Sequence, residues 1–376
     1  MKLAKLVVRN LRRRVGRTTL TVLGVGFALA LLVLVDSLST GLGQALGAGD
    51  GARTLIVYRK NRFCPQTSIL PEHYMARIER VDGVEAVLPV QVYLNNCRTS
   101  LDLVVFEGAP AAAALAQRDL EVVAGDAAAF ERAQDGALVG RVFAAKRGLN
   151  PGDRYRFGAV DVRIAGVFES KDPTKENVVL THLAYLQRAG DRIGSVTQFE
   201  VRVRAGADPA VVAQAIDGLF ATAQDPTHTK PRAAHLASAT ADLVEILALG
   251  RLLALACVVV VLALVANTVW MGAQERVREL GVMRAVGFRG VHLFRLVLGE
   301  ALSLSLLGAA MGVGGAFVVL ALTHVSIGTE GVAVNLAIDP WIALRGAAAA
   351  AAAGVVAGVV PAVQAARRGI ADALHS

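Results

Sequence analysis

A charged segment in the second half of the chain is the part best suited to act on another molecule. It reads ERVRELGVMRAVGF over Glu275–Phe288 and directly follows an apolar run. Four charged residues circle its first helical turn: Glu275, Arg276, Arg278 and Glu279. Their i,i+3 spacing pairs each glutamate with an arginine. Gly281 and Gly287 follow and permit a tight reversal. The spacing predicts a short, rigid elbow that presses on a protein or, alternatively, an ordinary polar loop.

No other group of side chains has the spacing of a catalytic or metal site. The seven histidines are scattered, and none stands at metal-ligand spacing beside carboxylates. The motifs G-x-S-x-G and H-E-x-x-H do not occur, and Gly-Lys never appears, which excludes the phosphate-binding loop G-x-x-x-x-G-K-[ST]. We therefore predict no catalytic residue, no metal and no cofactor held by this chain.

Three cysteines leave two interpretations open. Cys257 lies in an apolar run and is expected to act as a small hydrophobic residue. Cys64 and Cys97 both fall between the first two apolar stretches. They can form a disulfide if that segment lies outside the cytoplasmic membrane, and they stay as two thiols if it lies in the cytosol.

The composition is that of a membrane protein. Hydrophobic residues make up 54% and charged residues 19% of the 376 residues, against about a quarter charged in soluble domains. Four stretches reach the roughly 20 apolar residues that cross a bilayer: Thr18–Leu38, Leu252–Met271, Ala301–Leu322 and Trp341–Val363. The first exceeds the apolar core of a signal peptide, which favours an uncleaved anchor. Two glycine pairs, Gly24/Gly26 and Gly314/Gly315, are expected at helix contacts or kinks.

The distribution of charge predicts the orientation. Residues 41–245 carry 23 basic and 24 acidic residues, so the rest of the chain, with 16 basic and 7 acidic residues, has a net charge of +9. The first 17 residues hold seven Lys and Arg, and residues 274–295 hold five Arg, whereas residues 323–339 hold none. Basic residues gather on the cytoplasmic side. Both termini and the elbow are therefore expected in the cytoplasm, with residues 41–245 outside. Glu300 is expected at the inner end of the third span.

The predicted fold class is an α-helical membrane protein with four transmembrane helices and a large α/β extracytoplasmic domain between the first two. The predicted segments are a basic N-terminal helix 1–17, spans 18–40, 246–273, 296–322 and 340–363, the α/β domain 41–245 with an insertion at about 108–195, the elbow 274–295, an external loop 323–339 and a cytoplasmic tail 364–376.

Within the α/β domain, alternating apolar residues predict strands, and 3.6-residue periodicity predicts helices. Expected strands are Thr54–Arg59, Val84–Leu94, Leu101–Glu107, Phe199–Arg204 and a hairpin of Arg154–Phe157 with Val160–Glu169. Expected helices are Pro71–Val81, the Ala-rich Ala111–Arg132, and one capped by Asp208 that runs to Phe220 and buries Val211, Val212, Ile216 and Leu219. The last strand and helix are expected to complete the first lobe.

The elbow and both ends of the chain resemble the FtsX/MacB family of ABC-transporter permeases, of the MacB, LolC and DevC kind. The elbow fits the family's E-R-x-x-E-[IL]-G-x-x-[RK]-A-x-G, with Glu300 and Gly308 in the next span. The tail PAVQAARRGIADAL over Pro361–Leu374 is similar to the family's ending, with Ile370 where proline is usual. The start, Leu11–Gly24, is similar to its first span, and Gly148–Val167 to its external domain.

The resemblance implies a permease subunit that works with a dimer of cytoplasmic ABC ATPases and with a second permease copy or a paralogue. ATP and Mg²⁺ would be bound by the ATPase, and the elbow would transmit its movements to the external domain. A periplasmic adaptor and an outer-membrane channel are further implied partners. The implied ATPase-contact residues are Glu275, Arg276, Arg278, Glu279, Gly281, Arg284, Ala285 and Gly287.

Three functions stay open at this point. The first is export or extraction of a lipid, lipoprotein, peptide or drug from the bacterial inner membrane. The second is an FtsX-like regulator that activates an external cell-wall hydrolase, for which about 200 external residues are more than expected. The third is a membrane-tethered enzyme, against which the lack of a catalytic constellation counts.

Overall fold

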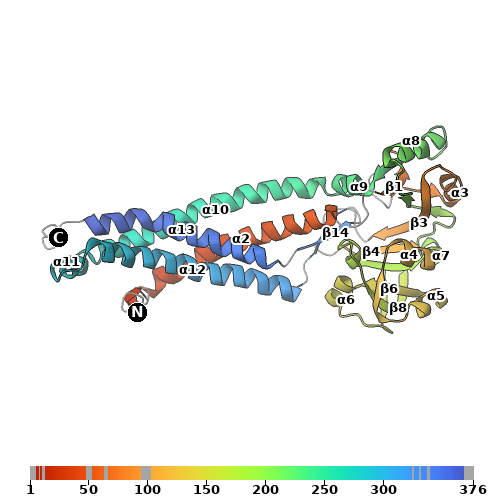
Figure 1. Cartoon of the computed structure of the whole chain (residues 1–376). Helices are drawn as coiled ribbons and strands as arrows, with labels where there is room; N and C mark the ends of the chain where they lie inside the picture. The colour runs from red at the N-terminus through yellow and green to blue at the C-terminus, as the bar shows by residue number, and fades with distance from the viewer. Residues whose placement is uncertain are drawn as a thin grey trace. The chain divides into compact units, whose positions relative to one another are not determined.

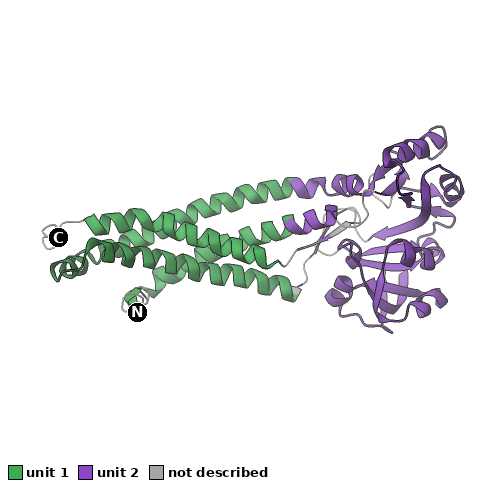
Figure 2. Cartoon of the chain, viewed as in Figure 1, with its two compact units in different colours: residues 1–39, 245–322, 337–376 green, residues 40–244, 323–336 purple. Residues whose placement is uncertain are grey.

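The chain divides into two compact units, which Figure 2 colours separately. The helical unit comprises residues 1–39, 245–322 and 337–376, and the α/β unit comprises residues 40–244 and 323–336. The computed structural model describes residues 6–7, 9–10, 13–47, 53–62, 67–94, 103–323, 326–329, 332–336 and 339–367.

Four long helices form the helical unit, and a short one joins two of them (Figure 1). They are α2 (Val15–Gly47), α10 (Ala241–Gln274), α11 (Val277–Ala285), α12 (Gly290–Thr323) and α13 (Pro340–Arg367). Each long helix has the length and apolar composition to cross a membrane, and each contains one of the four predicted spans. With a rise of about 1.5 Å per residue they are longer than the roughly 30 Å hydrocarbon layer. Their ends therefore extend into the headgroup region or beyond.

Close packing of α2 on α12 depends on glycines. A Cβ atom at Gly312 would lie 2.1 Å from the carbonyl oxygen of Gly26, and one at Gly308 would lie 2.4 Å from Val25. Helices that lack a hydrophobic drive to associate in lipid gain contact area where small residues let backbones approach. Gly24 similarly faces Leu264 of α10, so the prediction for Gly24/Gly26 is confirmed. At Gly314 and Gly315 an added Cβ atom would meet nothing within 4 Å, so the predicted contact is absent there, and the alternative of a kink stays a prediction.

Adding one methyl group to this contact is expected to loosen the bundle. Gly312→Ala should destabilise the folded chain by roughly 2 kcal/mol or more, because the obstacle is backbone rather than a movable side chain. Gly315→Ala, on the same helix, should be neutral or slightly stabilising because alanine favours the helix. The melting temperatures of both variants in the same detergent test the difference, and equal values would contradict this packing.

Small residues also line the face of α13 that packs on α12. Gly346, Ala350, Gly354 and Gly358 recur every four residues and are all buried. A Cβ atom at Gly358 would meet Ala301 at 2.7 Å. The helix starts at Pro340, and the side chain of the preceding Asp339 accepts a hydrogen bond of 2.9 Å from the Trp341 amide.

The α/β unit is built on a 10-stranded sheet with the order β12-β1-β11-β3-β4-β9-β6-β8-β5, in which β7 pairs with β8. Strands β2 with β10 and β13 with β14 form separate pairs. The strands are β1 (Thr54–Arg59), β2 (Leu70–Pro71), β3 (Val84–Leu94), β4 (Val105–Ala109), β5 (Glu121–Gly125), β6 (Gly136–Gly140), β7 (Arg154–Phe157), β8 (Val160–Glu169), β9 (Val178–His182), β10 (Ser195–Val196), β11 (Gln198–Val203), β12 (Thr227–Pro231), β13 (Ser326–Thr329) and β14 (Val332–Asn335).

Short helices cover the sheet (Figure 1). They are η2 (Glu72–Tyr74), α3 (Met75–Ile78), α4 (Ala111–Gln117), α5 (Ala127–Arg132), α6 (Arg141–Arg147), η3 (Lys175–Asn177), α7 (Leu183–Ala189), α8 (Pro209–Leu219) and α9 (Arg232–Ala239). One core joins β1, β11 and α8 around Phe199, Ile216 and Phe220. Strand β11 pairs with both β1 and β3, so the late strand completes the first lobe as expected.

Several sequence predictions hold in this unit, and two are wrong. The structure has the predicted hairpin of β7 with β8, and Asp208 caps α8 through the Ala210 amide. Strand β5 (Glu121–Gly125) interrupts the Ala-rich stretch that was expected to be one helix, because that segment pairs with β8. Val211 and Leu219 are 62% and 40% exposed, so only Val212 and Ile216 of the four residues predicted to be buried on this helix are buried.

Candidate functional site

The elbow is a turn followed by a capped helix. Helix α10 ends at Gln274, and Arg276 has φ −114° and ψ 18°, which breaks the helix before α11 begins. At the other end Gly287 has φ +102°, a conformation that favours glycine. The Phe288 amide donates to the Met283 carbonyl and the Gly287 amide to the Arg284 carbonyl, both at 3.0 Å. This is a Schellman cap, and it fixes the direction in which the chain enters α12.

The elbow carboxylates bind arginines that lie just before or at the start of α2. Arg13 lies 2.8 Å from Glu279, and Arg14 and Arg17 lie 2.9 and 3.1 Å from Glu275. The expected i,i+3 pairs within the elbow are therefore wrong for Glu275 and Glu279, because the turn at Glu275–Arg276 directs these side chains across to the N-terminal segment. We call these three ion pairs the elbow latch.

Next to the elbow latch, Glu300 and Arg276 form a largely buried ion pair. Glu300 of α12 is 6% exposed, and its two carboxylate oxygens accept hydrogen bonds from Arg276 at 2.9 and 3.3 Å. Asn10 donates a third at 2.6 Å. Helix α12 begins at Gly290, ten residues before Glu300, so the helix continues beyond the inner end of the span at which Glu300 is predicted. A buried carboxylate is costly unless it is paired, and Arg276 supplies the counter-ion.

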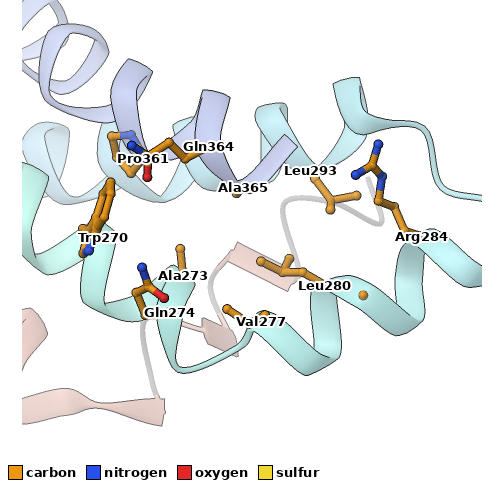
Figure 3. Close-up of a pocket in the computed structure, with 11 residues that line it drawn as sticks. Trp270, Ala273, Gln274, Val277, Leu280, Arg284, Leu293, Pro361, Gln364 and Ala365 are labelled. Carbon is orange, nitrogen blue, oxygen red and sulfur yellow. The ribbon is translucent and has the colours of Figure 1, made fainter. Parts of the chain in front are cut away.

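One face of α11 packs on the bundle and another is open. Leu280 and Gly281 are buried, and Leu280 belongs to the same apolar core as Leu293 and Ala365. A cavity of about 20 Å³ remains there, with Trp270 and Pro361 at one end and Arg284 at the other (Figure 3). On the open face Val282, Val286 and Phe288 are 50%, 75% and 44% exposed. Their neighbours Arg278, Ala285 and Gly287 are also exposed.

The structure thus separates the predicted contact residues into two sets. Glu275, Arg276 and Glu279 bind residues of the bundle, while Arg278, Ala285 and Gly287 lie on the open face; Gly281 is buried and Arg284 lines the small cavity. Sequence reasoning missed Arg13, Arg14, Arg17, Val286 and Phe288. The arginines were visible only as a topology signal, and the two apolar residues only as the end of the motif.

The remaining sequence predictions concern the three cysteines and metal binding. Cys64 and Cys97 lie outside the described residues, so their pairing stays a prediction. Cys257, in α10, is a free thiol. Among the described residues no group of three or more His, Cys, Asp or Glu side chains is placed to hold a metal ion.

The α/β unit has a buried charge network that the sequence did not indicate. Arg118 lies 2.6 Å from Glu107 and 2.8 Å from Glu200. Lys175 binds the same two carboxylates at 2.9 and 3.4 Å. Burial by itself raises the pKa of Glu107 and Glu200, but the two cations outweigh it and hold both pKa values below the usual range. The network joins β4, β11 and the connection from β8 to β9, so its role here is to hold distant segments together.

A partly buried histidine, His235, gives this unit a pH-dependent stability. Burial, followed by the charges of Lys230 and Arg232, lowers the pKa of His235 to about 4 from its ordinary 6.5. Between these values the unfolded chain binds the proton and the folded chain does not, so stability falls as pH drops from 6.5 toward 4. The melting temperature of the full chain should fall over this range, and His235→Gln should reduce the fall. An identical slope in the variant would contradict the assignment.

Comparison with protein families settles the identity of both units. The MacB-like periplasmic core domain matches residues 18–219, which is more than half of the chain. The FtsX-like permease C-terminal domain matches residues 251–370, which includes α11, α12 and α13. The chain belongs to the FtsX/MacB family of ABC-transporter permeases. Permeases of this family work with cytoplasmic ABC ATPases and are themselves generally not enzymes.

Solved structures add similarities to the periplasmic part of this permease. The periplasmic region of MacB from Actinobacillus actinomycetemcomitans is 11% identical over 48% of this chain and 90% of its own, with a TM-score of 0.38. The extracellular domain of the noncanonic ABC-type transporter YknZ from Gram-positive bacteria is 13% identical over 47% and 99%, with a TM-score of 0.35. No curated protein sequence matches the permease. Its four apolar helices and periplasmic-type domain indicate a multi-pass membrane protein.

Proposed function

We propose that this permease transmits conformational changes of a cytoplasmic ATPase through the elbow to the α/β unit on the other side of the membrane. Family membership supports the ATPase, and the basic residues of the N-terminal segment and elbow support the orientation. ATP and Mg²⁺ would be bound by the ATPase. A second permease copy or a paralogue would complete the complex.

The open face of α11 is the observation that carries this proposal. Val286 and Phe288 project from a capped helix end. Arg278, Glu279 and Arg289 in the same segment are exposed charges, which keeps the segment out of the hydrocarbon layer. Apolar side chains that neither the bundle nor lipid covers are suited to a protein partner. The ATPase would cover this face.

The elbow latch supplies a path for the movement. It ties α11 to the start of α2, and α2 continues past Ser39 into residues of the α/β unit. Helix α10 runs likewise from residues of the α/β unit to the elbow. A displacement imposed on α11 therefore has two continuous helices along which to act.

The work done outside would be extraction or export of a lipid, lipoprotein, peptide or drug, with a periplasmic adaptor and an outer-membrane channel as further partners. The size of the α/β unit favours this class over a small regulator of cell-wall hydrolysis. We expect the permease to lie in the bacterial inner membrane, with both termini in the cytoplasm.

The docking face is tested by placing charge on it. Val286→Asp with Phe288→Asp should abolish co-purification of the ATPase, because buried unpaired carboxylates at an interface are costly. Ile193→Asp, which alters a side chain that is 77% exposed in the α/β unit, is the matched control and should leave co-purification unchanged. Normal ATPase binding by the double variant would contradict docking at this face.

A further inference from the structure

A polar cavity of about 210 Å³ opens between α2, α10 and α12 at the elbow end of the helical unit. Its rim carries Arg13 and Arg14, whose side chains are 48% and 59% exposed. Leu304, Val269 and Thr268 lie deeper in its wall. At roughly 30 Å³ for each water molecule the cavity has room for about seven.

The cavity wall has more positive than negative charge. Among the residues that the structure describes, four arginines and three glutamates line it. Glu300 is bound by Arg276, and Glu279 by Arg13. Arg14 and Arg17 share a single carboxylate, Glu275, so one guanidinium charge is in excess. Each guanidinium has five N–H donors, and donors beyond those in the ion pairs remain to bind an anion.

In a helix bundle that spans a bilayer, this cavity would lie at the depth of the lipid headgroups. Arg17 is the third residue of α2, and Thr268 stands six residues, or about 9 Å, before the end of α10. The headgroup layer on each side of a bilayer is about 5–8 Å thick. Basic pockets between transmembrane helices at this depth bind lipid phosphates. Apolar side chains such as Leu304 and Val269 line the deeper wall.

We infer that this cavity binds the phosphate of an anionic phospholipid. The phosphate would bridge Arg13, Arg14 and Arg17, whose attachment to the elbow carboxylates leaves one positive charge in excess. A bound lipid would then add its charge to the elbow latch. This inference requires that the helices span a bilayer, but it does not require that the ATPase docks on α11.

The test compares two pairs of variants with the same change in net charge. The full chain, purified in a neutral detergent, is titrated with phosphatidylglycerol or phosphatidylcholine, and bound lipid is counted by native mass spectrometry. Arg13→Gln with Arg14→Gln should weaken phosphatidylglycerol binding about tenfold, because each arginine contributes to the free energy of binding an anionic lipid. Arg278→Gln with Arg289→Gln is the control, since both side chains are exposed on the elbow but do not line the cavity. It should bind nearly as well as the native chain.

Several outcomes would overturn the inference. Equal weakening by the two pairs would mean general charge attraction, and equal binding of phosphatidylcholine would remove the requirement for an anion. Displacement of the lipid by millimolar inorganic phosphate alone would point to a free phosphate site. If the double variant does not fold, the single variant Arg14→Gln replaces it, because Glu275 then stays paired with Arg17. This variant should also weaken phosphatidylglycerol binding, but by less than tenfold. Co-purification of the ATPase, measured on the same samples, reports the proposed function separately.

Discussion

Reversing both elbow carboxylates, by Glu275→Arg with Glu279→Arg, is expected to lower permease-coupled ATP hydrolysis at least about tenfold while the chain still folds. The three pairs of the elbow latch are partly exposed, and such pairs contribute about 0.2–1 kcal/mol each. Together they amount to roughly 2 kcal/mol, or about thirtyfold between an attached and a detached elbow. Reversal also replaces attraction with repulsion, while the bundle core is untouched.

A charge swap separates the latch from direct ATPase contact. If Glu279 acts by holding Arg13, then Arg13→Glu alone should reduce coupling, and Arg13→Glu with Glu279→Arg should restore much of it. The 2.8 Å distance between the two groups is suited to such an exchange. If Glu279 instead contacts the ATPase directly, Arg13→Glu alone should leave the coupling unchanged. The charge swap should then fail to restore the coupling. ATP hydrolysis by the purified complex is the measurement.

Breaking the buried pair of Glu300 and Arg276 is expected to have the largest effect on stability. Their side chains are 8% and 20% exposed. Glu300→Gln leaves the Arg276 charge without its counter-ion in the bundle, which costs about 3–5 kcal/mol. Replacing both residues, by Glu300→Met with Arg276→Met, removes both charges and should recover most of the stability. Melting temperatures of the purified chains measure both effects.

The second membrane-end pair in this chain is the control. Arg345 lies 3.6 Å from Asp36, but the side chains are 67% and 33% exposed. Arg345→Met should therefore cost no more than about 1 kcal/mol. A similar loss of stability for Arg345→Met and for Glu300→Gln would show that burial of Glu300 is not what makes its pair important.

The regular elements of the fold were predictable where one side of an element is buried along its whole length. Strands Thr54–Arg59 and Val84–Leu94 contain alternating or continuous apolar residues, and both have the predicted bounds in the structure. Strand β5 was missed because it is a largely exposed sheet edge within an Ala-rich segment. Neither the two-residue period of a half-buried strand nor the 3.6-residue period of an amphipathic helix is visible there. Its conformation comes from pairing with β8, about 40 residues later.

The site was predictable in composition but not in its pairings. The elbow motif identified the charged residues, yet their partners lie 24 to 266 positions away. Arg13, Arg14 and Arg17 were fully explained by the rule for membrane topology, so nothing in the sequence signalled a second role. Glu300 was placed at the inner end of the third span because the apolar run begins after it, but the sequence did not show that α12 extends ten residues beyond that point.

The central claim is that an ATPase drives this permease through the elbow. The most direct test is mild-detergent purification of the full chain from its native host, with mass spectrometry of the co-purifying proteins and an assay of ATP hydrolysis. We expect a stoichiometric ABC ATPase and ATP hydrolysis in the purified complex. Reproducible isolation of the chain without an ATPase or ATP hydrolysis would contradict the account and direct attention to an independent activity of the α/β unit.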